Sequence, residues 1–265
     1  EDQINLDAAV AVLRHLHRTQ PPDGSFLVFM PGMGEINALI AEMRAAEHTF
    51  GGAGSLRCVP LHSALSTADQ QRAFERPPAG VRKIVVSTDV AETSITIDDV
   101  VAVVDSGRHK RMEYDAANKL PSLAEGWISA ASRRQRRGRA GRVRAGEYWA
   151  LFTRSRCDDL EPFGVPEMQR VPLHDLCLQI KMLGMGEVAA FLRQAIEPPP
   201  AEAVEEALSA LEEAQALDKR QVLTPLGFHL ATLPVDIRLG KVLLFACLLR
   251  CVHPALVIVS LLAGG

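Results

Sequence analysis

SFLVFM, at residues 25–30, is a continuous apolar run between Gly24 and Pro31. Such a run, without polar alternation, is typical of a strand that is buried on both faces of a parallel sheet. The segment before it, Asn5–Arg18, places its leucines and a valine at helical spacing. A helix followed by a doubly buried strand favours an α/β fold.

Helical and strand-like segments then alternate along the chain. We expect further helices at about Met33–Glu47 and Ala68–Glu75, and further strands at Leu56–Leu61, Val81–Ser87, Val100–Asp105 and Glu147–Phe152. This alternation predicts a doubly wound α/β sheet with helices on both faces. Ligands of such sheets bind at the carboxyl ends of the strands.

Two regions depart from this pattern. Gly107–Ile128 alternates charged, polar and apolar residues around an Ala116–Asn118 tip, which predicts an inserted β-hairpin. After about Pro166 the strand signals end, and a mostly helical region is expected, with helices at Leu173–Met182, Val188–Gln194, Ala201–Ala216 and Ile237–Leu249. The final apolar segment, Pro254–Leu262, begins another helix, and we expect it to belong to an incomplete domain.

Composition excludes several classes of protein. Of the 265 residues 48% are hydrophobic and 23% are charged, which argues against disorder. The apolar stretch Val242–Leu262 is interrupted by Arg250 and Pro254, which argues against a membrane span. The five cysteines form no CxxC pair, and reduced thiols in an intracellular compartment, cytoplasmic or nuclear, are expected.

The formal net charge of −3 conceals a segregation of charge. Residues 81–156 hold 15 Lys and Arg against 9 Asp and Glu, a net charge of +6, and the remainder of the chain is acidic. A basic segment in such a chain indicates a local surface that binds phosphate groups.

The strongest signal for chemistry is QRRGRAGR at residues 135–142. Arg139 and Arg142 are three residues apart, so on a helix they would project from neighbouring positions of one face. Two converging guanidinium groups can hold a polyphosphate and stabilise charge that develops in phosphoryl transfer. A solvated basic helix or a localisation signal would not need the interleaved glycines Gly138 and Gly141, so we favour a phosphate site.

A second signal, STDVAETSITID at residues 87–98, follows a predicted strand. Hydroxyl side chains and backbone N–H groups just beyond a strand can bond to phosphate oxygens. Asp98 is placed to accept a hydrogen bond from a ribose hydroxyl. An ordinary turn or cap aspartate is the commoner explanation on composition alone, and both explanations stay open.

The ordered motifs resemble those of the DEAH-box RNA helicases. STDVAETSITIDDVVAVVDSG (87–107) and QRRGRAGR resemble motifs V and VI, while FLVFMPGMGEI (26–36) and LHSALSTADQQRAF (61–74) resemble the motif IV and IVa regions. The hairpin falls where that family carries one. VPLHDLCLQIKMLG (171–184) and LTPLGFHLATLPVDIRLGKVLL (223–244) resemble its winged-helix domain and the start of its helical ratchet domain.

The resemblance implies a domain organisation and a set of site residues. Residues 1–165 would form a second RecA-like helicase lobe, 166–233 a winged-helix domain and 234–265 the truncated start of a ratchet domain. It assigns Gln135, Arg139 and Arg142 to the nucleotide phosphates, with the arginines as fingers, and Asp98 to the ribose. It places Gly32, Thr88, Ser94 and Thr96 near the RNA backbone, and the hairpin would guide the strand.

Two motifs of such helicases do not occur in the sequence. There is no GxxxxGK[ST] phosphate loop and no DEAH acidic motif, both of which belong to the preceding lobe in that family. We therefore expect part of an ATP-dependent RNA helicase that couples hydrolysis to translocation or unwinding and is inactive alone. ATP with Mg²⁺ would be its cofactors, with the metal ligands in the upstream lobe. Its partners would be RNA, that upstream lobe and an activating protein, without a membrane.

Three other functions compete with this one. A non-catalytic RNA-binding or scaffolding module would lack a working upstream lobe. A related motor that acts on DNA, or as a nuclease subunit, fits the TSITID and LTPLG segments less well. A metabolic α/β enzyme would need a catalytic cluster, but the eight histidines are scattered, without nucleophile or metal spacing.

Overall fold

The structure is a computed structural model that describes residues 3–93, 95–115, 120–142 and 145–263. The chain divides into two compact units. Unit 1 comprises Glu1–Arg111 and Leu123–Gly164, and unit 2 comprises Met112–Ser122 and Val165–Gly265.

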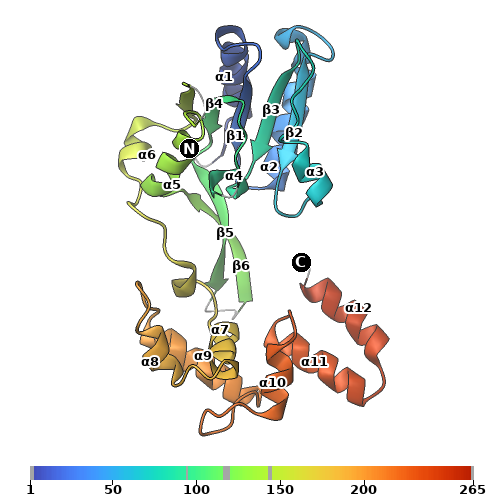
Figure 1. Ribbon diagram of the computed structural model, residues 1–265, viewed down its shortest axis with the longest axis vertical. Coiled ribbons are helices and arrows are strands. Elements are labelled where there is room, and N and C mark those ends of the chain that lie inside the picture. Colours follow the sequence, from blue (N-terminus) through green and yellow to red (C-terminus); the bar gives the residue numbers. More distant parts are fainter. Residues whose placement is uncertain (1–2, 94, 116–119, 143–144, 264–265) are drawn as a thin grey trace. The chain divides into compact units, whose positions relative to one another are not determined.

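A five-stranded parallel sheet forms the centre of unit 1 (Figure 1). Its strands, in the order β2-β3-β1-β4-β7, are β2 (Leu56–Leu61), β3 (Arg82–Ser87), β1 (Ser25–Phe29), β4 (Val100–Asp105) and β7 (Glu147–Ala150). β1 pairs with β3 on one side and with β4 on the other. The predicted parallel α/β sheet is confirmed, and the strand order reverses at β1, next to which ligands of such sheets bind.

Helices cover both faces of this sheet because the strand residues are apolar on both sides. The helices of unit 1 are α1 (Leu6–Thr19), α2 (Met33–Ala45), α3 (Thr67–Gln71), α4 (Val90–Thr93), α5 (Ala130–Gly138) and α6 (Arg154–Asp158), with a 3₁₀ turn η1 at Glu47–Phe50. Phe26 and Val28 pack with α1 and α2, whereas Leu27 and Phe29 pack with Ala91 of α4 on the opposite face. Each such buried side chain contributes about 1.5–3 kcal/mol of hydrophobic stabilisation.

The helix expected at Ala68–Glu75 ends earlier, at Gln71. The cause is Lys83, which is buried in β3 and donates hydrogen bonds to the carbonyl oxygens of Ala73 and Glu75, at 2.9 and 3.1 Å. The same ammonium group lies 3.0 Å from the carboxylate of Asp99. The carbonyl groups therefore turn towards a buried cation instead of continuing the helix.

The inserted hairpin is present as β5 (Arg108–Asp115) and β6 (Leu120–Trp127), a separate two-stranded sheet. Its predicted tip at Ala116–Asn118 lies outside the described residues. At its base, Trp127 is contacted by two guanidinium groups, that of Arg108 at 3.8 Å from the ring centroid and that of Arg156 at 5.0 Å. Gly107 has a φ of 71°, and a side chain there would overlap Phe152. The base of the hairpin is thus firmly packed on unit 1.

Unit 2 is helical around its own apolar core. Its elements are η2 (Glu167–Gln169), α7 (His174–Met182), α8 (Val188–Leu192), α9 (Ala201–Glu213), α10 (Pro225–Ala231), α11 (Ile237–Leu248) and α12 (Val252–Ala263). α10 was not among the expected helices, although it has clear start signals. The Thr224 hydroxyl accepts a hydrogen bond from the Gly227 N–H at 2.9 Å, and Pro225 occupies the first helical turn.

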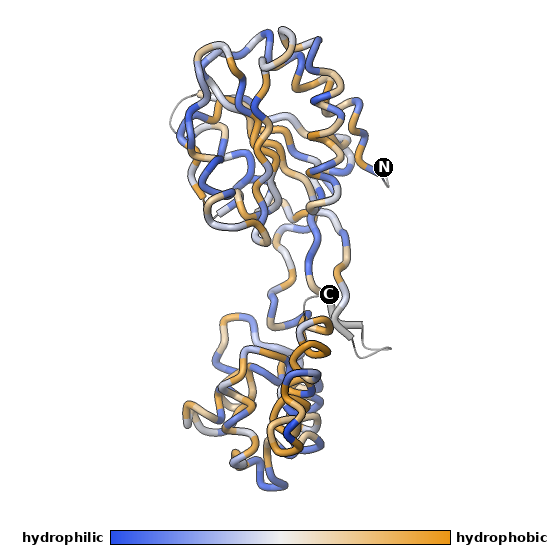
Figure 2. The backbone as a smooth tube through the Cα atoms, turned by 90° about the vertical axis from the view of Figure 1, so that its right-hand side faces the viewer, coloured by the Kyte–Doolittle hydropathy of each residue, from blue (hydrophilic) through white to orange (hydrophobic). Residues whose placement is uncertain are grey.

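Hydrophobic residues are also exposed in unit 2. The sheet strands of unit 1 and the last helix, α12, are both strongly hydrophobic in Figure 2. The helices of unit 2 nevertheless expose apolar side chains, since Leu248 of α11 is 77% exposed and Leu261 of α12 is 72% exposed. None of the helices in the described part of the chain has the length and hydropathy that a membrane span requires.

Candidate functional site

The arginine motif lies at the end of α5 and in the turn that follows. The Ser129 hydroxyl caps the start of α5 by accepting a hydrogen bond from the Ser132 N–H at 3.1 Å, and the helix ends at Gly138. Arg139 and Arg142 therefore lie beyond the helix, and not on one helical face as the spacing suggested. They are brought together by a turn, with Ala140 buried against the sheet.

Both arginines bind to the segment that follows α4. The guanidinium group of Arg139 donates hydrogen bonds to the carbonyl oxygen of Ile95, at 2.9 Å, and to that of Glu92. Arg142 donates to the Thr96 hydroxyl. Partial burial and the nearby charge of Arg142 lower the pKa of Arg139. Two cationic groups thus converge on one short loop, an arrangement suited to a polyphosphate.

Two further residues predicted for the nucleotide are exposed. Gln135 lies on α5, and Asp98 lies two residues beyond Thr96. Asp98 lies two residues before the start of β4 and borders a hollow together with Pro22 and Gly80. It therefore lies at the amino end of β4, on the loop to which the arginines bind.

Gly32 and Thr88 lie at the opposite, carboxyl edge of the sheet. They follow the neighbouring parallel strands β1 and β3, so they belong to the same edge. Both residues are buried, and Thr88 is 5% exposed. A Cβ at Gly32 would lie 3.0–3.1 Å from side-chain atoms of Glu35 and Lys110, so a larger residue here would press on that ion pair.

Lys110 of the hairpin base binds Glu35 of α2 beside Gly32. Its ammonium nitrogen lies 2.8 and 3.0 Å from the two carboxylate oxygens. Burial alone would raise the pKa of Glu35, but the hydrogen bond and charge of Lys110 and a backbone hydrogen bond lower it. The hairpin is thereby attached to the first turn of α2.

The structure divides the predicted RNA-contacting residues between these two places. Gly32 and Thr88 share the carboxyl edge, whereas Thr96 is bonded to Arg142 and belongs with the arginine pair. Ser94 lies outside the described residues. Thr96 is therefore held by Arg142, away from the carboxyl edge.

Sequence reasoning missed Arg136, the residue of the motif that is completely buried. Its Nε donates to the Glu92 carboxylate at 2.9 Å, and its Nη1 donates to Asp105 Oδ1 at 2.8 Å. Burial disfavours its charge, but the carboxylates of Asp105 and Glu92 outweigh that effect and raise the pKa of Arg136. Ser132, one turn earlier on the same face of α5, also donates to Glu92, at 2.6 Å, but no signal in the sequence marks either contact.

The same carboxylates accept further hydrogen bonds. Asp105 Oδ2 accepts from the Tyr148 hydroxyl at 2.8 Å, and Oδ1 also accepts from the Gly107 N–H at 2.9 Å. Burial and the charge of Asp105 raise the pKa of Tyr148. Glu92, Asp105, Arg136, Ser132 and Tyr148 form what we call the Arg136 network.

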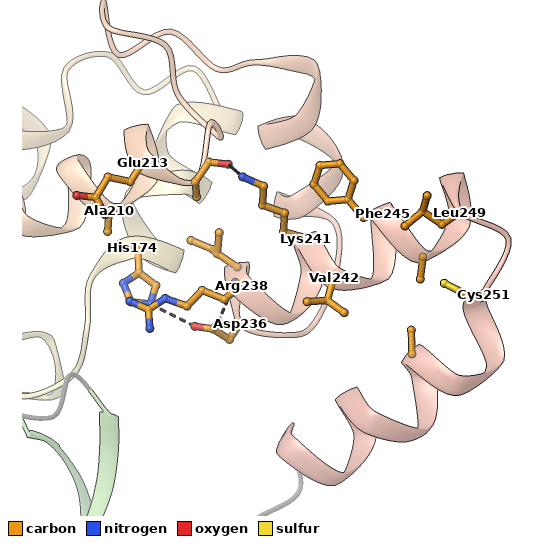
Figure 3. Close-up of a pocket in the computed structure, with 14 residues that line it drawn as sticks. His174, Ala210, Glu213, Asp236, Arg238, Lys241, Val242, Phe245, Leu249 and Cys251 are labelled. Atoms are coloured by element: carbon orange, nitrogen blue, oxygen red, sulfur yellow. Dashed lines mark hydrogen bonds and ion pairs between the residues drawn. The ribbon is translucent and has the colours of Figure 1, made fainter.

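A separate pocket lies in unit 2 (Figure 3), where His174, Asp236 and Arg238 stand opposite an apolar wall that includes Phe245 and Leu249. His174 Nε2 lies 3.5 Å from Asp236 Oδ2. The hydrogen bond from His174 lowers the pKa of Asp236 more than partial burial raises it. The described residues contain no group of three or more His, Cys, Asp or Glu side chains that could hold a metal ion.

Comparisons with known proteins show which family the chain resembles. Residues 8–144 match the family model described as helicase conserved C-terminal domain. The chain is 48% identical over 261 residues to the DExH-box ATP-dependent RNA helicase DExH4, chloroplastic, of Arabidopsis thaliana, covering 98% of this chain and 18% of that protein. It is 43% identical to the human ATP-dependent DNA/RNA helicase DHX36, covering 99% of this chain and 26% of that protein.

A solved structure is also similar. The E. coli DExH-box NTPase HrpB matches with a TM-score of 0.75 and 31% identity, over 92% of this chain and 29% of HrpB. The chain thus spans about a quarter or less of the length of its relatives DExH4 and DHX36.

Proposed function

The chain belongs to the helicase conserved C-terminal domain family, with DExH-box ATP-dependent RNA helicases as relatives, and from that premise we propose that it forms one wall of a split ATP site. The observation that carries the proposal is the convergence of Arg139 and Arg142 on the loop from Glu92 to Thr96. Closure of an upstream RecA-like lobe would bring the ATP phosphates to these two guanidinium groups.

In this proposal the side chains divide the work of holding the nucleotide. Arg139 and Arg142 stabilise negative charge on the phosphates, because guanidinium groups bind phosphate oxygens in a bidentate manner. Exposed Gln135 on α5 orients the phosphates beside them, and Asp98 accepts a hydrogen bond from the ribose. Mg²⁺ does not fit the described residues, which offer no cluster of ligands, and its ligands would belong to the upstream lobe.

The carboxyl edge of the sheet is proposed to hold the nucleic acid. Gly32 and Thr88 at this edge, together with Thr96 beside the arginine pair and with Ser94, would contact the phosphate backbone of RNA, largely without regard to base sequence. The relative DExH4 is an RNA helicase by name, which supports RNA as the nucleic acid, while the relative DHX36 is named a DNA/RNA helicase. ATP should bind the closed form better than the open one, so that hydrolysis releases the closure and moves the strand.

We propose the same domain organisation as the resemblance implies. Residues 1–165 would be the second RecA-like lobe, 166–233 the winged-helix domain and 234–265 the start of a ratchet domain. The support is that unit 1 and unit 2 have separate cores, and that the chain of unit 1 ends at Gly164. An activating protein partner and a cytoplasmic or nuclear location stay predictions.

The test is ATP hydrolysis by the chain alone and after it is joined to its upstream lobe, each with and without single-stranded RNA. We expect no ATP hydrolysis by the chain alone and RNA-stimulated hydrolysis by the joined protein. Absence of hydrolysis by both would favour a non-catalytic scaffold. Hydrolysis by the chain alone would contradict the split site, and stimulation by DNA but not RNA would contradict the proposed substrate.

A further inference from the structure

Arg136 lies between two structures that the proposed function treats separately, namely the arginine pair and the hairpin. It projects from α5, one turn before Arg139, into the interior of unit 1. Its guanidinium carbon lies 4.7 Å from the centroid of the Phe29 ring. Its side chain is 0% exposed, and so is that of Asp105. Figure 1 shows α5 and α4 near the start of β5.

One side of the Arg136 network holds the arginine pair. Glu92 of α4 accepts from Arg136 through its carboxylate and from Arg139 through its backbone carbonyl oxygen. The position of α4 is therefore tied to both arginines at once. A shift of α5 against α4 would break hydrogen bonds to Glu92 and move the guanidinium group of Arg139.

The other side holds the base of the hairpin. Arg136 Nη1 also donates to the backbone carbonyl oxygen of Arg108, at 3.2 Å, and its partner Asp105 accepts from the Gly107 N–H. Gly107 and Arg108 are the residues at which the chain enters β5. The Arg108 side chain in turn stacks on Trp127, where β6 ends. The guanidinium groups of Arg136 and Arg108 thus join the base of both strands to α5.

Stability alone does not explain this arrangement. A buried ion pair is commonly no more stabilising than apolar residues of the same volume, but it imposes a fixed geometry on its partners. The described side chains also satisfy both oxygens of Asp105, through Arg136, Tyr148 and the Gly107 N–H. A network whose buried carboxylate is bonded in this way specifies a single orientation of α5, α4 and the hairpin base.

We propose that Arg136 is a positioning residue that couples the phosphate-binding arginines to the hairpin, so that RNA at the hairpin and ATP at the arginines sense each other. The inference rests on the proposed function, because it needs both ligands. Arg136 itself touches neither. Its effect should appear in the stimulation of hydrolysis by RNA rather than in the binding of ATP.

The experiment uses the protein joined to its upstream lobe and measures kcat and KM for ATP with and without single-stranded poly(U) RNA. Arg136→Lys keeps the positive charge but loses the guanidinium group, which bonds to Glu92 through Nε and to Asp105 through Nη1. We expect it to lower RNA-stimulated kcat by about 10²-fold, as small misplacements of catalytic groups do. Basal kcat should fall much less than RNA-stimulated kcat, and the KM for ATP should change little. Arg134→Lys, on an exposed position of the same helix, should leave all values unchanged.

Tyr148→Phe is the milder variant, and it decides the question if Arg136→Lys does not fold. It removes one hydrogen bond to Asp105, and we expect RNA-stimulated kcat to fall by about tenfold, the effect of one bond to a charged group. Equal losses with and without RNA, or unchanged stimulation in both variants, would overturn the coupling and leave the proposed function standing. Absence of RNA stimulation in the unchanged protein would overturn both.

Discussion

Unit 1 and unit 2 bury different kinds of side chain. Among the described residues, every buried polar or charged side chain belongs to unit 1: Ser25, Arg82, Lys83, Ser87, Thr88, Glu92, Asp105, Ser106, Ser129 and Arg136. The core of unit 2 is apolar, and unit 2 also leaves large hydrophobic residues such as Leu248 exposed. Buried charge is costly unless it is paired. Unit 1 therefore gains fixed geometry from its charges, whereas unit 2 relies on apolar packing.

The largest expected effect separates activity from stability in unit 1. Arg142→Ala in the joined protein should lower ATP hydrolysis by about 10³–10⁵-fold, the usual worth of an arginine finger. Because Arg142 is exposed, its removal should leave the unfolding transition in place. Steady-state hydrolysis and thermal unfolding of the same preparation check both statements. Near-normal turnover would refute the assignment of Arg142 to the phosphates.

The next effect tests the buried charge directly. Asp105→Ala leaves Arg136 without one carboxylate in the interior, which should lower the free energy of unfolding by about 3–5 kcal/mol. Urea unfolding followed by tryptophan fluorescence measures it, because Trp127 and Trp149, the two tryptophans of the chain, both belong to unit 1. A loss below about 1 kcal/mol, the usual worth of an exposed ion pair, would mean that Arg136 and Asp105 are not buried together in solution.

A slightly smaller effect is expected from the core of unit 2. Leu211 of α9 is completely buried, and Leu211→Ala should cost about 2–5 kcal/mol by leaving a cavity. The loss should appear in the helical circular dichroism signal and leave the tryptophan transition of unit 1 unchanged. Leu183→Ala, at a position that is 68% exposed, is the matched control. Equal movement of both signals would show that the two units unfold together.

The smallest effect concerns pH. The hydrogen bond from His174 lowers the pKa of Asp236, so the stabilisation is present above the unfolded pKa and is lost as the pH falls through the folded value. Unit 2 should lose less than about 1 kcal/mol below about pH 4, since the Asp236 side chain is 44% exposed. Asp236→Asn preserves the cap of α11 and should flatten this loss in circular dichroism. If Asp236→Asn leaves the loss of stability below about pH 4 unchanged, Asp236 is not the group responsible for it.

The strands were predictable because their signal is local. Leu56–Leu61 and Val100–Asp105 have the bounds that the apolar runs indicated, and no distant contact was needed to find them. The helix at Ala68–Glu75 was predicted too long because its last carbonyl groups bind Lys83, which is a tertiary contact. Periodicity reports which residues are apolar, but it does not report which cation the fold buries.

The candidate site shows the same division. Arg139 and Arg142 could be singled out from the glycines between the arginines, and the structure brings them to one loop. The helix that was expected to align them ends at Gly138, so a turn does so instead. Arg136 looked like its neighbours in the sequence, because its carboxylate partners lie 31 and 44 residues away. Only the folded chain distinguishes a buried arginine from an exposed one.

The strand order has a consequence for how the chain folds during its synthesis. β1 lies in the middle of the sheet, between β3 and β4, yet it is made first. Its second neighbour is complete only at Asp105, 76 residues after Phe29. At about 5–20 residues per second, translation leaves this largely apolar strand without one of its partners for roughly 4–15 s. An unpaired strand of this kind is prone to aggregate, so the nascent chain should depend on chaperones during that interval.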